Sequence, residues 1–455
     1  MIHWRRFFYI VRSSFWFVPG VMAITAVMLA IAFAEYDFGI GYGPGFAQVT
    51  DETGMPVDSA RSILSTIVGS MITVTTLVFS MTLVAMTLVA QQLGPRIVIR
   101  FMDNRPTQIF LGLFLATFLF ALIVLVRIGY VDADGQVPNI AIILSTGLVI
   151  LSMGAIIAFI HNVARRIQAD QIVAELGTEF RAATDRLVQN TSGKEPFASL
   201  KELEELEALF KSRKILEIGA PESGYLNVLD EQAALDFLER EDLVVRVVSS
   251  PGGFVLQGVP VLEVAAEGFD DERVEEIKER LGVMLSVLPT RTAEVTLDFE
   301  VNALTEVALR ALSPGINDPY TARACIHRLG TGLRALLDHP GRPPVTRGED
   351  EAVRIVHHCQ PFGYYCSLAL RPLMNAGRDH AEVLSDIAHM LGALGAMAER
   401  EERGQDVIVN LDALEETLGN CGLIPSDRTW VKEHIRLARE KVERKMSGLA
   451  GDAGD

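Results

Sequence analysis

Eight residues in the segment 59–92 combine small or polar side chains with helical spacing. Most of their steps are three or four residues, which places them on one face of a helix. They are Ser62, Thr66, Gly69, Thr73, Thr76, Ser80, Thr87 and Gln91. Such a stripe on an otherwise apolar helix is typical either of a polar path for ions or of close helix packing, in which small residues let backbones approach. Both interpretations stay open, and we carry the eight residues forward as pore-lining candidates.

Three arginines follow this segment: Arg96, Arg100 and Arg105. In an oligomer they would form a ring of positive charge at a cytoplasmic mouth, which favours anions. The alternative role is topological, because arginines beside a span set its orientation and contact lipid phosphates.

A second polar group occurs where two predicted helices meet, at residues 313–320. Asp318 suits an N-cap and Pro319 the first helical position, so a structural role would be sufficient. The functional alternative is a ligand pocket at a helix N-terminus, where anions are favoured. Its candidate residues are Ser313, Asn317, Asp318, Tyr320 and Arg323.

Metal and enzyme signatures are weak in this sequence. His357, His358, Cys359 and Cys366 lie close together, but their spacing matches no standard zinc pattern, so we predict no metal and no cofactor. The sequence contains no Walker A, His-Glu-x-x-His or Gly-x-Ser-x-Gly motif. We therefore expect that the protein is not an enzyme.

The elements that position these residues are helices long enough to cross a bilayer. Apolar stretches at about 15–34, 59–92, 109–128 and 140–160 each reach the roughly 20 residues that a span requires. A hydrophobic share of 49% is also high for a soluble chain of 455 residues. We predict an α-helical transmembrane domain over residues 1–160, in contact with the lipid bilayer.

Charge separates the two parts of the chain and predicts its orientation. Residues 1–160 carry eight Arg, no Lys and eight acidic residues, so the net charge of −17 belongs to residues 161–455. Arginines precede the first span and separate the second from the third, whereas the loop between the first two is acidic. The positive-inside rule then places both termini in the cytoplasm of a bacterial inner-membrane protein. The acidity makes nucleic acid an improbable partner.

The cytosolic region is expected to be α+β. Helical spacing continues past the fourth span, so we expect a stalk helix and linker at 161–198. Residues 199–268 predict a small barrel-like or sandwich-like α/β domain, with strands near 214–218, 225–229, 243–248, 254–257 and 261–264. Residues 269–447 predict a helical domain, with helices near 271–287, 298–312, 319–338, 349–358, 380–402 and 427–447. The tail 448–455 is expected to be disordered.

Two motifs resemble those of a known family. Residues 79–96, FSMTLVAMTLVAQQLGPR, and residues 311–322, ALSPGINDPYTA, are similar to the bacterial "predicted membrane protein" family of undefined function. The resemblance covers nearly the whole chain and implies four N-terminal transmembrane helices, but it implies no substrate or catalytic residue.

The leading hypothesis is a homo-oligomeric, channel-like membrane protein. Copies of the second span would surround a path for small inorganic ions, with anions favoured, and the cytosolic region would act as a gate, filter or sensor. The alternative is a non-conducting, membrane-anchored sensor or scaffold that binds a ligand in its cytosolic domain.

Overall fold

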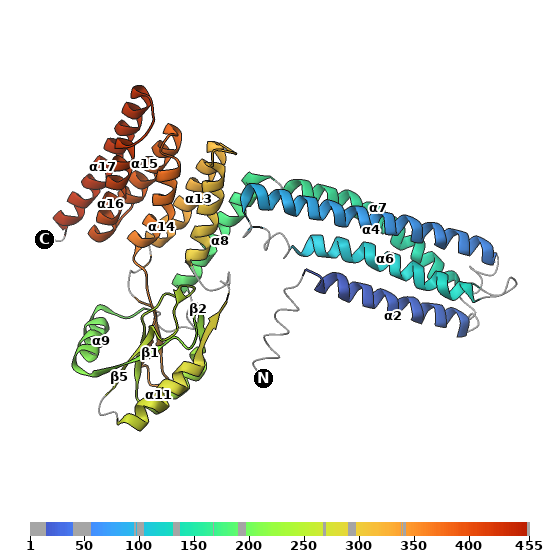
Figure 1. The fold of residues 1–455 in the computed structure, drawn as a ribbon, viewed down its shortest axis with the longest axis horizontal. Coiled ribbons are helices and arrows are strands. Elements are labelled where there is room, and N and C mark those ends of the chain that lie inside the picture. Colours follow the sequence, from blue (N-terminus) through green and yellow to red (C-terminus); the bar gives the residue numbers. More distant parts are fainter. Residues whose placement is uncertain are drawn as a thin grey trace. The chain divides into compact units, whose positions relative to one another are not determined.

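A computed structural model describes the fold of the chain in two compact units, residues 1–171 and residues 172–455 (Figure 1). We call them the N-terminal unit and the C-terminal unit. The residues described are 15–39, 56–94, 97, 104–130, 137–166, 168–189, 197–266, 270–289, 297–337, 339 and 343–452.

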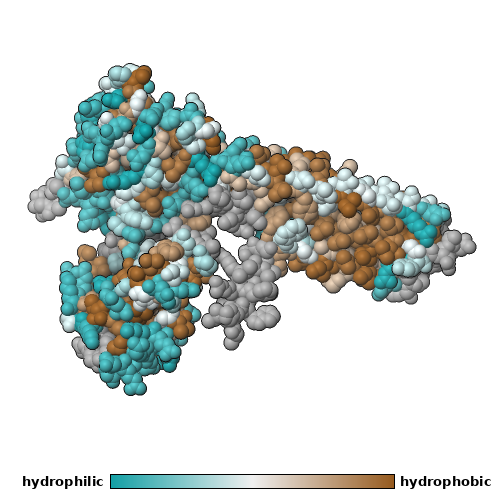
Figure 2. Space-filling model, in the orientation of Figure 1, coloured by the Kyte–Doolittle hydropathy of each residue, from teal (hydrophilic) through white to brown (hydrophobic). Residues whose placement is uncertain are grey.

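Four long helices make up the described part of the N-terminal unit: α2 (Phe17–Gly39), α4 (Val57–Leu93), α6 (Arg105–Gly129) and α7 (Asn139–Arg166). All four are long and apolar enough to cross a membrane, which confirms the prediction of four spans. Their outer surface is largely apolar (Figure 2).

Helix α6 is the centre of this unit and packs against each of the other three helices. Asn104 starts it by accepting the Thr107 N–H at 2.9 Å. Gly112 lets α2 approach, since a Cβ there would lie 3.2 Å from the Pro19 Cα atom. On another side, the hydroxyls of Thr117 and Ser152 lie 3.1 Å apart and join α6 to α7.

The expected continuous stalk is wrong. Helix α7 ends at Arg166, Gln168 is not helical, and α8 (Ala169–Gln189) is a separate helix. Phe180 of α8 is fully buried and packs against the backbone at Gly332. Both residues of this contact lie in the C-terminal unit.

The C-terminal unit contains a five-stranded sheet in the order β1 (Lys214–Gly219), β5 (Pro260–Ala266), β3 (Val244–Val247), β8 (Val353–Val356) and β7 (Val345–Arg347). Neighbours are antiparallel except β3 and β8, which are parallel. A second, antiparallel sheet has the order β4 (Phe254–Val255), β2 (Gly224–Leu229), β6 (Leu285–Leu288).

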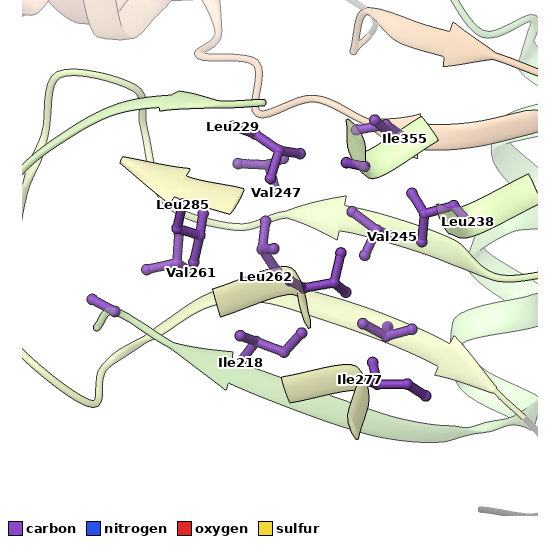
Figure 3. Close-up of a cluster of buried hydrophobic side chains, with 14 of the residues drawn as sticks. Ile218, Leu229, Leu238, Val245, Val247, Val261, Leu262, Ile277, Leu285 and Ile355 are labelled. Carbon is purple, nitrogen blue, oxygen red and sulfur yellow. The ribbon is translucent and has the colours of Figure 1, made fainter. Parts of the chain in front are cut away.

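One apolar core joins the two sheets to helices α10 (Glu231–Arg240) and α11 (Asp271–Met284). Figure 3 shows Val245, Leu262 and Ile355 from the larger sheet gathered with Ile277 of α11. The five strands predicted from sequence are confirmed as β1 to β5. The expected boundary at residue 268 divides this fold, because β6, β7 and β8 follow that residue.

Two other expectations about this region are wrong. The predicted helix at 349–358 is β8 with its flanking turns, because Val353, Ile355 and Val356 are β-branched and the last two are buried beside β3. The predicted helix at 271–287 ends at Met284, where the chain enters β6.

The remaining helices form two layers. One layer consists of α12 (Leu297–Ala311), α14 (Phe362–Ala376) and α16 (Glu401–Gly419), each packed against the next. The other consists of α13 (Pro319–Leu337), α15 (Ala381–Ala396) and α17 (Pro425–Asp452), packed in the same way. A further helix, α9 (Leu200–Ser212), precedes β1.

Sequence reasoning placed some of these helices and missed others. The helices expected at 298–312 and 319–338 are confirmed as α12 and α13, whereas the one expected at 380–402 is interrupted between α15 and α16. Helix α17 extends to Asp452, so the prediction of a disordered tail is wrong for residues 448–452. Residues 453–455 lie outside the described residues.

Candidate functional site

All eight residues of the predicted polar stripe on α4 are exposed in the single chain. The buried residues of α4 form a different face, which includes Leu64, Met71, Val78 and Val89. At about 100° per residue, the stripe is centred nearly opposite that face. Along the upper edge, where α4 lies, Figure 2 shows a pale band of intermediate hydropathy beside an apolar surface. The stripe is therefore not used for packing α4 within its own bundle.

The threonines of the stripe satisfy their own donors. The hydroxyls of Thr66, Thr73, Thr76 and Thr87 donate to the carbonyl four residues earlier at 2.8, 3.0, 2.9 and 2.9 Å. Each hydroxyl oxygen keeps accepting capacity on the outer face. Gly69 leaves open space on the same face of α4, because a Cβ built on it would meet nothing within 4 Å.

The arginines proposed for a mouth are only partly described. Arg96 and Arg100 lie outside the described residues, so the prediction for them is not tested. Arg105 begins α6 and is exposed.

Sequence reasoning overlooked two arginines that fall inside the expected spans, Arg61 and Arg127. Arg127 pairs with Glu35 of α2 at 3.1 Å, and Arg61 donates to the Ile128 carbonyl at 3.2 Å. Arg61 also lies 3.7 Å from Asp58. These contacts connect α2, α4 and α6 at the end of the bundle opposite Arg105. A charged residue inside an apolar span, with acidic residues nearby, was the sequence signal for them.

The turn at residues 313–320 has the expected helix cap. Asp318 accepts the N–H groups of Tyr320 and Thr321, each at 3.1 Å, and the Thr321 hydroxyl at 2.6 Å. Asn317 adopts a left-handed φ of 51°, which asparagine tolerates better than most residues. The N-cap interpretation is confirmed, and both oxygens of the carboxylate accept hydrogen bonds in it.

The other pocket candidates of this turn do not converge on a cavity. Ser313 donates to the Arg310 carbonyl at 2.6 Å, and Tyr320 is 77% exposed. Arg323 forms a 2.7 Å ion pair with Asp386, which also lies 3.1 Å from His327 Nε2. The Asp386 hydrogen bond raises the pKa of Arg323. The ligand interpretation of these five residues remains a prediction.

The His and Cys residues of this cluster lie in two different environments. Cys366 is fully buried in α14, whereas His357, His358 and Cys359 follow β8 beside a cavity. Within the part of the chain that the structure describes, no three His, Cys, Asp or Glu side chains are placed to hold a metal ion.

Together these features define a multi-pass membrane protein with four N-terminal spans and an α+β C-terminal unit. The chain belongs to the DUF2254 family, described as "Predicted membrane protein", whose model matches residues 12–393. Both sequence motifs lie within that match, so the predicted family resemblance is confirmed.

Curated relatives from mycobacteria are similar over most of the chain. The uncharacterized proteins MT1328 and Rv1290c of Mycobacterium tuberculosis and Mb1321c of Mycobacterium bovis are each 23% identical over 424 residues. The alignments cover 89% of this chain and 79% of each relative. No solved structure matches the chain.

Proposed function

We propose that the protein is a homo-oligomeric, channel-like protein of the bacterial inner membrane that gives small inorganic ions a path along α4. The observation that carries the proposal is the position of the polar stripe, which lies opposite the packed face of α4 and is exposed along its whole length. The proposal assigns no catalytic step to the chain.

In a membrane this face of α4 would meet either hydrocarbon or other copies of α4. Hydroxyl and amide groups gain little from contact with hydrocarbon, whereas facing copies of α4 would offer them each other or water. Four helices in one chain are too few to enclose a wide path, so the stripe requires several subunits around a shared axis. Apolar residues on either side of the stripe, such as Ile63, Ile72 and Met81, are exposed and suit contact with lipid or with a neighbouring subunit.

Anions are the favoured permeant class, and the C-terminal unit is placed in the cytoplasm as a gate or sensor. Both statements rest on the arginines that follow α4 in the sequence, which would be cytoplasmic by the positive-inside rule. Labelling of an introduced cysteine near Asp452 in intact and opened cells would test that orientation.

Disulfide crosslinking tests the shared axis directly. Thr73→Cys places a thiol on the stripe, and Met81→Cys places one about a quarter turn away on the same helix. In membranes treated with copper phenanthroline, we expect a crosslinked dimer from Thr73→Cys and none from Met81→Cys or the wild type, whose four native cysteines control for background. Equal crosslinking at both introduced positions would contradict an ordered axis.

Two glycines separate subunit association from folding of the single bundle. Gly69 is open on the stripe, while Gly112 contacts Met22 and Pro19 of α2. We expect Gly69→Leu to reduce the oligomer seen by native mass spectrometry with little change in monomer stability. Gly112→Leu should destabilise the bundle itself, because a larger side chain has no room there.

Conduction is tested with purified protein in liposomes. We expect chloride or iodide flux that Thr73→Trp blocks and that Met81→Trp leaves within about twofold. An ordered oligomer that passes no ion would reject conduction and leave the second candidate.

That second candidate is a membrane-anchored sensor that binds a ligand in the C-terminal unit. The observation that favours it is the cavity beside His357 and His358.

A further inference from the structure

A cavity of about 380 Å³ lies where the parallel strands β3 and β8 both end. The end of β3 contributes Arg246, Val247 and Val248, and the segment after β8 contributes His357, His358 and Cys359. Parallel strands that end at one edge place their following residues side by side, which is why such edges often hold ligands. The volume lies in the range of small-molecule sites.

Arg246 is held in a fixed orientation at this cavity. Its Nε and Nη2 atoms donate to Glu263 Oε2, and its guanidinium carbon lies 4.3 Å from the Phe210 ring centroid. Nη1 makes no hydrogen bond to the residues that the structure describes, so within them this donor is unused.

The two histidines supply further polar atoms. His357 Nε2 lies 2.8 Å from the Thr346 hydroxyl, which orients the ring. His358 Nε2 is buried and has no hydrogen-bond partner among the residues that the structure describes. A buried polar atom without a partner costs free energy, and a hydrogen bond to a ligand or to a water molecule would remove that cost.

The charge of the lining differs from that of the whole protein. The chain has a net charge of −17, yet the described residues that line the cavity include no Asp or Glu. The remaining walls are apolar: Val247, Val248, Pro343, Val356 and Pro361. The site thus combines one guanidinium, which is paired with Glu263, and two imidazoles with a surface that can cover an apolar body.

We propose that this cavity binds a small organic anion, with its carboxylate or phosphate toward Arg246, His357 and His358 and its apolar body against Val248 and Val356. The proposal is independent of ion conduction, because every lining residue lies in the C-terminal unit.

Binding should be linked to protonation. Burial lowers the pKa of His357 and of His358 below the ordinary 6.5, so both imidazoles are neutral at pH 7. The charged groups facing the cluster are Glu231 near His357, Asp298 near His358, Arg403 near Cys359, and Glu263 on Arg246. A bound anion would stabilise the imidazolium form, so affinity should increase from pH 8 to pH 6.

Isothermal titration calorimetry of the full chain in detergent tests the site. The probes are benzoate and phenyl phosphate, with benzamide as the neutral counterpart and inorganic phosphate as the head group alone. We expect at least one organic anion to bind, more tightly at pH 6, and benzamide and inorganic phosphate to bind at least about tenfold more weakly.

Matched variants locate the binding. His358→Gln should weaken it by about tenfold or more, and Val248→Phe should fill the cavity and abolish it. His389→Gln, an exposed histidine on α15, should leave it unchanged. We avoid Arg246→Gln as the main test because loss of the Glu263 pair could destabilise the sheet. Thermal unfolding of each variant shows whether the fold is kept.

Several results would overturn the proposal. One is that neither organic anion binds at roughly 10 mM, where a Kd of about 1 mM would be evident. Another is that benzoate binds no better than benzamide, or phenyl phosphate no better than inorganic phosphate. The last is that the affinity is unchanged in His358→Gln and Val248→Phe variants that remain folded.

Discussion

Arg347 and Glu202 form a two-pronged ion pair between strand β7 and helix α9, across 145 residues of sequence. The Nη1 to Oε1 distance is 2.6 Å and the Nη2 to Oε2 distance is 3.2 Å. Glu202 also accepts the Ser199 N–H at 2.8 Å, which completes a capping box at the start of α9. One carboxylate therefore both starts a helix and attaches it to the larger sheet.

Replacing that carboxylate should weaken the C-terminal unit. The Arg347 hydrogen bond, followed by those of Ser199, lowers the pKa of Glu202 from 4.5 to about 2. We expect Glu202→Gln to cost about 1 kcal/mol of unfolding free energy at pH 7, a value reduced for solvent screening. Because the folded-state pKa is the lower one, this contribution is present above pH 4.5 and is lost as the pH falls toward 2. Urea unfolding measures it, with exposed Glu204→Gln as the control; equal effects would contradict the assignment.

A glycine pair tests how α8 is attached to the C-terminal unit. A Cβ at Gly332 would collide with the Phe180 ring, whereas one at Gly282 in α11 would meet nothing within 4 Å. We expect Gly332→Ala to destabilise by about 1–3 kcal/mol through overpacking. Gly282→Ala should stabilise by about 0.5–1 kcal/mol, since alanine favours the helix. Thermal unfolding distinguishes them, and a neutral Gly332→Ala would mean that α8 packs loosely.

The contribution of the Asp318 cap to stability can be measured directly. Asp318→Ala should cost about 1 kcal/mol because Tyr320 and Thr321 lose their acceptor. Asn317→Gly should stay within about 0.5 kcal/mol of the wild type, because glycine adopts the left-handed conformation without strain. Chemical unfolding at neutral pH measures both; an unchanged Asp318→Ala would show that water replaces the carboxylate.

His339 should make stability fall in mild acid. Burial, with the nearby charges of Arg403 and Arg400, lowers its pKa from 6.5 to about 4. Below pH 6.5 the unfolded chain therefore binds a proton that the folded chain accepts only near pH 4, so the contribution is present above pH 6.5 and is lost as the pH falls through this window. The full loss is about 3 kcal/mol.

Comparing wild type with His339→Gln between pH 7.5 and pH 4 tests this dependence. The free energy of unfolding of the variant should decrease less as the pH falls. His357 and His358 should still give a residual decrease in the same direction. Identical slopes in both proteins would contradict the assignment to His339.

The spans and β1 to β5 were predictable because their signals are local: an apolar run of bilayer length, or alternating residues between turns. Strand β8 was not, since Val353–Val356 is short and its β-branched residues decide for a strand only beside Val245, its neighbour in the sheet. Helix α14 was missed because Gly363 and Pro372 interrupt its helical pattern.

The candidate sites also divide into features that one segment of sequence shows and features that depend on contacts between segments. The Asp318 cap follows from residue types in one turn, and the periodicity of the α4 stripe is likewise visible in the sequence. Which side of α4 faces its neighbours depends on α6 and α7, and the partner of Arg323 is Asp386 on another helix. Such relationships become visible only when separate elements are placed together.

The parallel pairing of β3 with β8 has a consequence for synthesis of the chain. Until Val353 to Val356 have left the ribosome, β3 can bond on one side only, to β5, and its other edge stays open. An open strand edge with apolar neighbours readily recruits other chains. A nascent or truncated product that stops before β8 would therefore be prone to aggregate, and its protection would depend on chaperones until translation passes this strand.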